Sequence, residues 1–489
     1  MAVIKEQPNP QESITVTDNR TGKTVTIPIT NNSIPATAFT ALKAPTTAGK
    51  RQEDDLGNGI RVYDPGFMNT AAIKSRITYI DGDAGELRHR GYPIEQLAER
   101  STYLETAYLL IYGHLPDASQ SKIWEYEVMH HTFLSEDLTS LLRSMRYDSH
   151  PMSIFITAFS SLSAYHPEAN PSLAGQNLYT TSPELLNKQV IRALGKSSTI
   201  AALSLRIRMN RPAIAPRADL TYTENLLYMM DALSPADPYR PDPRLAKALD
   251  TLFILHADHE MNCSTAAMVH VGSSRVDPYS AIAAAASALY GPLHGGANEA
   301  VIRMLQRIGS VDRVPAFLEG VKKKKELLFG FGHRVYRNTD PRSTIIRKVA
   351  EEVFSILGRD PDGLIEIAQA LRDAALKDPY FVERKLYPNV DYWSGLIYKT
   401  MGFPLDFFPV LFAVPRVSGW LAHWKQNLEE GTGKIWRPRQ VYVGEGRRDY
   451  VELGEREARK VEDSREGVRE LPHYQSRRRG PRGGVPAKL

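Results

Sequence analysis

The chain is poor in cysteine and in long apolar runs. Cys263 is the single cysteine among 489 residues, so no internal disulfide can form, and this composition fits a reducing compartment. No apolar run approaches the ~18 residues that a membrane-spanning helix needs. One of the longest, 407–414, is interrupted by Pro409 and followed by Pro415. We therefore expect neither a disulfide framework nor a membrane partner.

A basic folded surface is also lacking. The formal net charge is +5, but residues 455–489 hold ten Lys and Arg against six Asp and Glu, so this tail supplies +4. Nucleic-acid binding needs a basic face on the folded part, and we therefore expect no nucleic-acid partner. Residues 1–8 lack the apolar core of a signal peptide, and Glu6 argues against a transit peptide.

The final residues resemble a targeting signal. Ala487-Lys488-Leu489 differs in one small residue from the Ser-Lys-Leu tripeptide that the peroxisomal import receptor reads. A polar stretch rich in Arg and Gly, 476–484, precedes the tripeptide and would keep it exposed. We expect import into the peroxisome through this receptor, with the cytoplasm as the alternative location.

The pattern of apolar residues predicts a mostly α-helical protein with a short β-rich N-terminal segment. β-Branched residues alternate over 13–17 and 23–28 around a turn at 18–22, which predicts a β-hairpin. From Pro93 onward, apolar residues recur at i, i+3 and i+4, which is typical of helices. The predicted helices are 94–112, 185–208, 222–233, 244–259, 278–289, 299–308 and 343–357. No Gly-x-Gly-x-x-Gly follows a strand, which argues against a Rossmann unit.

One segment combines a glycine-flanked histidine with an arginine at a helix start. His333 follows Gly332 and stands nine residues before Arg342. Asp340-Pro341 is typical of a helix start, with Asp as N-cap and Pro at N1, which puts Arg342 in the first turn. A cation there opposes the helix dipole, so we interpret Arg342 as facing an anion. The alternative is a salt bridge to a nearby acid.

Two further segments place polar side chains near helix starts. His294 lies in the glycine-rich connection 291–296, just before a helix expected to begin near Ala297, where backbone N–H groups favour negative charge. The alternative is an ordinary surface-loop histidine. Asp391 follows Asn389, a natural N-cap, and the helix dipole there would keep its carboxylate ionised.

A third pattern superficially resembles a metal site. His256 and His259 would share one face of a helix beside Glu260, as a metal-dependent hydrolase could require. The spacing differs from His-Glu-x-x-His, and a third ligand is not evident. We therefore expect packing, or one hydrogen bond to a ligand, rather than metal binding.

Arginines in apolar surroundings complete the set of candidate site residues. Arg416 and Arg437 lie among aromatic residues and prolines, unlike a solvated charge stripe. Together with Arg342 they would suit a dicarboxylate, because guanidinium groups pair with carboxylates through two parallel hydrogen bonds. Two histidines, one carboxylate and several arginines indicate carbon–carbon chemistry on a small, multiply charged acid.

Taken in order, these motifs resemble those of the citrate synthase family. The matching segments are 88–94, 255–260, 291–298, 331–336, 340–342, 387–391 and 437–442. The resemblance implies the two-domain citrate synthase fold, both domains being helical. Its parts would be a β-rich segment 1–75, a large domain 76–296 and 403–453, a small domain 297–402, and a disordered basic tail 454–489. The N-terminus is similar to the bacterial-type branch, and the final tripeptide to a peroxisomal, glyoxylate-cycle isoform.

The resemblance also implies a reaction, the condensation of acetyl-CoA with oxaloacetate and water to give citrate and coenzyme A, with neither cofactor nor metal. Asp391 would remove a methyl proton, His294 would hydrogen-bond the thioester oxygen, and His333 would polarise the oxaloacetate ketone. 2-Methylcitrate synthases use the same catalytic set with propionyl-CoA. This alternative stays open, because one methylene discriminates by only about 1–3 kcal/mol.

The remaining roles concern substrate binding. The resemblance implies that His259, Arg342 and Arg416 hold oxaloacetate together with Arg437, which would reach across from the other subunit of a homodimer. Arg337 would contact coenzyme A. Because citryl-CoA rather than acetyl-CoA must be hydrolysed, we expect the small domain to close over the large one once oxaloacetate is bound.

Overall fold

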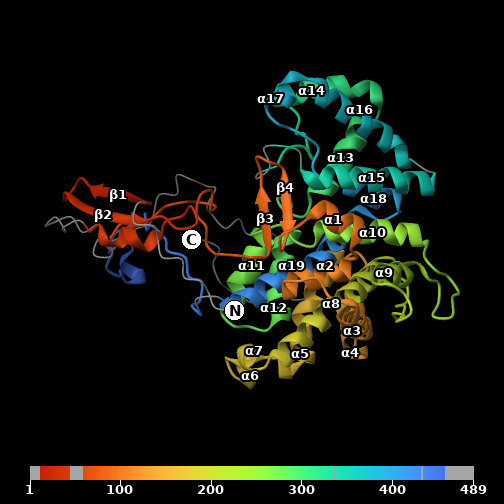
Figure 1. The fold of residues 1–489 in the computed structure, drawn as a ribbon, viewed down its shortest axis with the longest axis horizontal. Coiled ribbons are helices and arrows are strands. Elements are labelled where there is room, and N and C mark those ends of the chain that lie inside the picture. Colours follow the sequence, from red (N-terminus) through yellow and green to blue (C-terminus); the bar gives the residue numbers. More distant parts are fainter. Residues whose placement is uncertain are drawn as a thin grey trace. The chain divides into compact units, whose positions relative to one another are not determined.

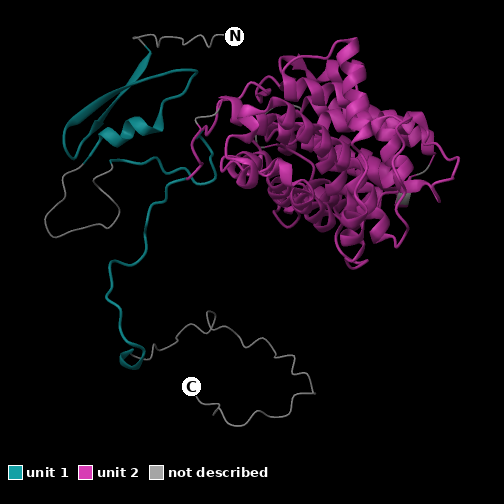
Figure 2. Cartoon of the chain, turned by 90° about the horizontal axis from the view of Figure 1, so that it is seen from below, with its two compact units in different colours: residues 1–70, 438–489 teal, residues 71–437 magenta. Residues whose placement is uncertain are grey.

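The computed structural model describes residues 12–43, 59–333, 336, 338, 340–358, 360–430 and 433–456. The chain forms two compact units, one of residues 1–70 and 438–489 and the other of residues 71–437 (Figure 2). Most of the tail predicted for 454–489, including the final tripeptide, lies outside the described residues.

The first unit contains the predicted hairpin. Strands β1 (Ser13–Asp18) and β2 (Lys23–Pro28) pair antiparallel, with Ser13 opposite Pro28 and Asp18 opposite Lys23. Gly22 closes the turn with φ 71°, a conformation that favours glycine, and its N–H donates to the Asp18 carbonyl at 2.7 Å. The hairpin prediction is confirmed.

The second unit is almost entirely helical (Figure 1). Its helices are α1 Ile94–Arg100, α2 Tyr103–Tyr112, α3 Ala118–His130, α4 Glu136–Arg143, α5 Pro151–Tyr165, α6 Pro171–Ala174, α7 Leu178–Thr181, α8 Pro183–Arg208, α9 Tyr222–Asp231, α10 Pro243–His256, α11 Cys263–Gly272, α12 Pro278–Tyr290, α13 Ala297–Ile308, α14 Val314–Lys322, α15 Pro341–Leu357, α16 Leu364–Lys377, α17 Pro379–Glu383, α18 Val390–Thr400 and α19 Phe408–Glu430. The mostly α-helical class predicted from the sequence is confirmed.

A small sheet precedes these helices and was not predicted. Strands β3 (Thr78–Asp81), β4 (Glu86–His89) and β5 (Tyr92–Pro93) pair antiparallel in that order. The β3–β4 turn is stabilised by Asp81, whose carboxylate accepts the N–H groups of Asp83 and Ala84. The register sets Thr78 opposite His89, so their side chains lie on one face of the sheet.

Helix α19 is the central core helix of this unit and contacts α2, α8, α10, α11 and α12. In the part of the chain that the structure describes, Leu405–Glu430 is the one helical stretch long and apolar enough to cross a membrane, but 89% of its apolar 18-residue window is buried inside the protein. The helix continues through Pro415, and the buried Tyr103 hydroxyl donates to the carbonyls of Val414 and Pro415 at 3.4 and 3.2 Å.

The predicted helices 94–112 and 244–259 differ from the observed ones. The predicted helix 94–112 is divided between α1 and α2, since Thr102 and Glu105 form a capping box that starts α2. The predicted helix 244–259 ends at His256, so His259 lies in the loop that follows α10. His256 and His259 therefore do not share a helix face.

Helices α13 to α18 gather in one region of the second unit, where α13, α15 and α18 pack together and α16 contacts α13, α14 and α17 (Figure 1). Helix α15 joins this group to α1 and α10. The division into a large domain and a small domain of residues 297–402 stays a prediction, because both groups belong to one compact unit.

Candidate active site

The loops that carry His333 and Asp391 are joined by hydrogen bonds. The Gly332 N–H donates to the Tyr387 carbonyl at 2.8 Å, and the Asn389 side-chain amide donates to the Gly332 carbonyl at 2.9 Å. Asn389 also caps α18, where its side chain accepts the Asp391 N–H at 3.0 Å, so the predicted helix start is confirmed. These bonds hold the His333 loop against the helix start that bears Asp391.

His333 forms an aromatic cluster with His259 and Tyr336. The ring centroids of His259 and His333 lie 5.2 Å apart, and those of His333 and Tyr336 lie 4.8 Å apart. The His259 Nε2 is 3.3 Å from the Tyr336 hydroxyl. The Tyr336 N–H donates to Nδ1 of His333 at 3.3 Å, so the neutral His333 ring carries its proton on Nε2.

Burial and positive charge keep these histidines neutral. Burial, reinforced by Arg342, lowers the pKa of His333 to about 4. Burial and the same arginine also hold the pKa of His259 well below its ordinary value. Both rings are therefore neutral near pH 7, and each can donate a hydrogen bond from one nitrogen only.

His294 lies in the loop between α12 and α13, as predicted, and contacts the start of α11. The Ser264 N–H donates to Nε2 of His294 at 3.3 Å, and the Ser264 hydroxyl is 3.0 Å from the same atom. An amide N–H can only donate, so Nε2 is an acceptor and the proton of the neutral ring is on Nδ1. Burial, with a smaller effect from Arg416, lowers the pKa of His294 to about 4.

Arg342 is buried and pairs with Asp340. Its Nε and Nη2 donate to the two carboxylate oxygens at 3.1 and 2.9 Å, and Asp340 also caps α15 by accepting the Arg342 N–H. The predicted N-cap and N1 proline are confirmed. The structure therefore contains the salt bridge that was the alternative interpretation of Arg342. These bonds use the Nε–H and one N–H of Nη2, so a further anion would meet the two N–H groups of Nη1 and the remaining N–H of Nη2.

Arg416 is buried on α19 beneath the same cluster. Its Nε donates to the His256 carbonyl at 2.7 Å, and its guanidinium carbon lies 4.8 Å from the centre of the Phe412 ring. Burial lowers the pKa of Arg416 to about 10, against the opposing effect of Asp258, so the guanidinium stays charged near pH 7. A buried cation of this kind favours the binding of an anion.

Asp391 has a higher pKa than its position at a helix start suggested. Burial raises the pKa of its carboxyl from 3.8 to about 6, although Arg342 and Arg416 oppose the change. Desolvation thus outweighs the opposite effect of the helix dipole on the pKa of this carboxyl. The carboxylate is still mostly ionised at pH 7, and it is a stronger base than an exposed aspartate.

Two predicted substrate-binding residues, Arg437 and Arg337, are not placed at this site. Arg437 is exposed, and the neighbouring Trp436 N–H donates to the Ser273 hydroxyl at 2.9 Å, at the end of α11 opposite His294. The two ends of this helix are about 15 Å apart. Arg337 and the final tripeptide 487–489 lie outside the described residues.

His256, His259 and Glu260, the residues of the alternative metal-site pattern, are not arranged around a common point that could hold a metal ion. His256 is buried, and neither ring nitrogen has a hydrogen-bond partner among the described residues; its ring packs 4.4 Å from that of Phe412. Within the described part of the chain, no three His, Cys, Asp or Glu side chains are placed to hold a metal ion. Packing against Phe412 is the contact that the structure shows for the His256 ring.

Sequence reasoning overlooked several residues that position the site. The Ser264 N–H donates to Nε2 of His294, and Tyr336 contacts both His259 and His333. The negative charge of Asp258 favours the charged form of Arg416. Ser264 was detectable, because Asn262 is an N-cap that places it in the first turn of α11. The partners of Asp258 come from distant parts of the chain, so local sequence carries no signal for them.

The fold and this site define a helical enzyme that forms a carbon–carbon bond on a small acid with several carboxylates. The family model that matches is "Citrate synthase, C-terminal domain", over residues 66–439. This match covers most of the chain. The chain belongs to the citrate synthase family.

Individual relatives agree with this assignment. The peroxisomal citrate synthase of Dictyostelium discoideum is 55% identical over 92% of this chain and 89% of the relative. The glyoxysomal citrate synthase of Cucurbita maxima is 53% identical over 91% of this chain and 84% of the relative. Among solved structures, citrate synthase of Thermoplasma acidophilum, in a ternary complex with carboxymethyl coenzyme A and oxaloacetate, is 32% identical with a TM-score of 0.71, covering 79% of this chain and 98% of that one.

Proposed function

We propose that this enzyme condenses acetyl-CoA with oxaloacetate and water to give citrate and coenzyme A. The observation that carries the proposal is the joining of the His333 and Asp391 loops above two buried arginines, Arg342 and Arg416. The Thermoplasma relative was solved with oxaloacetate and an acyl-CoA analogue, which are the two classes of ligand that such a site would accept.

Asp391 and His294 are proposed to activate acetyl-CoA. The Asp391 carboxylate, with its pKa raised to about 6 by burial, takes a proton from the methyl carbon. The electrons of that C–H bond move to the thioester oxygen, which accepts a hydrogen bond from Nδ1–H of neutral His294. One preorganised donor of this kind contributes about 2.7–4 kcal/mol where it has been measured.

Oxaloacetate is proposed to bind between His259, Arg342 and Arg416. The two guanidinium groups balance its two carboxylates, and His259 supplies a neutral hydrogen-bonding group. Nε2–H of His333 would then donate to the ketone oxygen and polarise it, because the proton of this ring is not on Nδ1. His294 and His333 act as neutral donors in this scheme, since the pKa of each is about 4.

The bond-forming step follows from this arrangement. The enolate carbon of acetyl-CoA attacks the ketone carbon, a carbon–carbon bond forms, and the electrons of the C=O π bond move to the ketone oxygen, which takes the Nε2 proton of His333. The proton that Asp391 took from the methyl group is passed back to Nε2 of His333 through solvent, so both side chains return to their starting states. Water then attacks the thioester of citryl-CoA, the C–S bond breaks, and citrate and the coenzyme A thiol leave. We propose that closure of residues 297–402 excludes water until citryl-CoA has formed. An identical solution scattering profile with and without oxaloacetate would contradict such closure.

We propose further that Arg437 completes the oxaloacetate site of a second subunit in a homodimer. This follows from its exposure and from its distance from His294 along α11. Mixing inactive Arg437→Ala and Asp391→Ala proteins tests the idea. If Arg437 acts across the interface, exchanged dimers contain one intact site, and about a quarter of all sites recover. If it acts within its own chain, no activity returns.

Two proposals concern the parts of the chain outside the described residues. Arg337 is proposed to contact coenzyme A, and Arg337→Ala should raise KM for acetyl-CoA more than KM for oxaloacetate. A peroxisomal location is proposed because two relatives are named as peroxisomal and glyoxysomal enzymes. The import receptor would read Ala487-Lys488-Leu489, so a fluorescent fusion ending in this sequence should enter peroxisomes, and the same fusion without Leu489 should stay in the cytoplasm.

Product analysis tests the proposed reaction. Purified protein given oxaloacetate and acetyl-CoA should yield citrate and coenzyme A thiol in equal amounts. Propionyl-CoA in place of acetyl-CoA should give much slower thiol release. Faster formation of 2-methylcitrate than of citrate would overturn the proposed substrate, and absence of both products would overturn the proposed reaction.

A further inference from the structure

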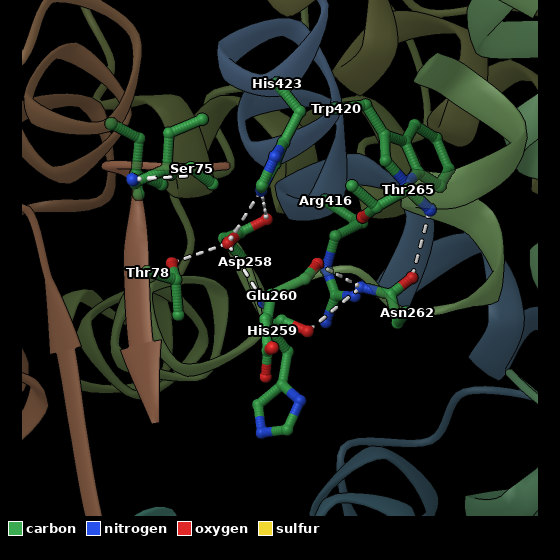
Figure 3. A network of polar contacts seen from close by, with 12 residues as sticks. Ser75, Thr78, Asp258, His259, Glu260, Asn262, Thr265, Arg416, Trp420 and His423 are labelled. Atoms are coloured by element: carbon green, nitrogen blue, oxygen red, sulfur yellow. Dashed lines mark hydrogen bonds and ion pairs between the residues drawn. The ribbon is translucent and has the colours of Figure 1, made fainter. Parts of the chain in front are cut away.

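Asp258 is a buried carboxylate that the proposed mechanism does not use. It precedes His259 in the loop after α10 and is fully buried. The Thr78 hydroxyl donates to its Oδ2 at 2.6 Å, the Glu260 N–H donates to the same oxygen at 3.2 Å, and Nε2 of His423 lies 3.2 Å from Oδ1. Figure 3 shows the carboxylate between Thr78 and His423, with the His259 ring directed away from it.

The number of hydrogens on Thr78 and Asp258 fixes which group donates in each hydrogen bond of this network. An ionised carboxylate only accepts hydrogen bonds, so the single hydroxyl hydrogen of Thr78 goes to Asp258. Nδ1 of the buried His89 is 3.0 Å from the same hydroxyl oxygen, and it must therefore be the donor. Burial lowers the pKa of His89 to about 4, so its ring is neutral and Nδ1 holds its only proton. The chain of donors thus runs from His89 through Thr78 to Asp258.

Helix α19 braces the other side of the same loop. Gly419 donates its N–H to the Ala257 carbonyl at 3.1 Å, and a Cβ at Gly419 would lie only 2.5 Å from Oδ1 of Asp258. Arg416 and His423 lie three residues before and four residues after Gly419, so the three share one face of the helix. The loop therefore has little room to shift relative to α19.

Asp258 also influences the charge of Arg416. Burial alone would raise the pKa of Asp258, but His423, His89 and Arg416 outweigh burial and hold the pKa well below its ordinary value. Its charge in turn supports the charged form of Arg416, whose pKa burial lowers. Asp258 is thus a permanent anion beside a buried cation of the oxaloacetate site.

We propose that Asp258 is a positioning residue for oxaloacetate binding, which fixes the His259 loop against the β3–β4 sheet and α19 and supplies the counter-charge of Arg416. It acts through His259 and Arg416 and does not touch the substrate. The proposal rests on the proposed function of this site. It also gives the unpredicted sheet a role, since Thr78 and His89 come from β3 and β4.

Asp258→Asn keeps the size of the side chain and removes its charge, and Asp250→Asn is the matched control. Asp250 is largely buried, with a side chain that is 13% exposed; it lies on α10 and accepts the Tyr103 N–H at 3.1 Å. Asp258→Asn should raise KM for oxaloacetate about ten-fold or more, with KM for acetyl-CoA changed less than about three-fold. Asp250→Asn should leave both constants unchanged.

Thr78→Val is a milder variant for the case in which Asp258→Asn does not fold. It removes one hydrogen bond and keeps the charge, and it should raise only KM for oxaloacetate, by about two- to ten-fold. Equal rises in both KM values, unchanged values, or the same effect from Asp250→Asn would overturn the positioning role. Failure of the unsubstituted enzyme to make citrate would instead overturn the proposed function, so the two failures are distinguishable.

Discussion

The acidic limb of the pH–rate profile should report the ionisation of Asp391. Burial raises the pKa of this carboxyl from 3.8 to about 6. Only the ionised carboxylate can accept the methyl proton, so the rate should rise with pH as Asp391 ionises. With a pKa of about 6, about one molecule in eleven is ionised at pH 5 and about ten in eleven at pH 7, a rise of about ten-fold. A carboxyl with its ordinary pKa would change the rate by less than about a tenth over this interval.

Initial rates of coenzyme A thiol release at saturating oxaloacetate, measured between about pH 5 and 8, test this expectation. His294 and His333 add nothing to the limb, because each pKa is about 4 and both rings are already neutral. Asp250→Asn is the control, since burial also raises the pKa of Asp250 to about 6, but this carboxylate faces the start of α2 at Tyr103. A flat profile down to about pH 5, or a limb that disappears in Asp250→Asn, would refute the reasoning.

Three further predictions concern stability and the acetyl-CoA half of the site. The pKa of Asp391 is raised on folding from 3.8 to about 6, so the fold loses stability as the pH rises from about 4 to about 6, and the loss is complete above that range. Asp391→Asn should therefore raise the free energy of unfolding by about 3 kcal/mol at pH 8 and by almost nothing below about pH 4, as urea titrations will show. His294→Ala should lower kcat about 100-fold or more, whereas Ser264→Ala, which keeps the backbone N–H that fixes the tautomer, should lower it less than about ten-fold in the thiol assay. Gly419→Ala would bring its Cβ within 2.4 Å of the Ala257 carbonyl oxygen, and it should lower the free energy of unfolding by about 1–3 kcal/mol in thermal or urea denaturation. A Gly419→Ala protein as stable as the unsubstituted enzyme would contradict the close packing described for α19.

The sequence was most informative where structure depends on neighbouring residues. The β1–β2 hairpin and the helix starts at Asp340 and Asn389 follow from turn and capping residues, and each is confirmed. The capping box of Thr102 and Glu105 was equally local and could have been recognised, which would have separated α1 from α2.

Other features depended on residues far apart in the chain. The raised pKa of Asp391 comes from burial, which helix-start patterns do not reveal. The persistence of α19 through Pro415 is accompanied by hydrogen bonds from Tyr103, more than 300 positions earlier. The partners of Asp258 lie on β3, β4 and α19, so only the folded chain brings them together.

The most direct test of the account is coenzyme A thiol release from acetyl-CoA by the unsubstituted enzyme and by Asp391→Asn at about pH 7, with and without oxaloacetate. We predict rapid release that requires oxaloacetate and that falls at least about 100-fold in Asp391→Asn, with the variant still folded and still able to bind oxaloacetate. Release without oxaloacetate, or release that survives in Asp391→Asn, would contradict the proposal that Asp391 deprotonates the methyl group for condensation.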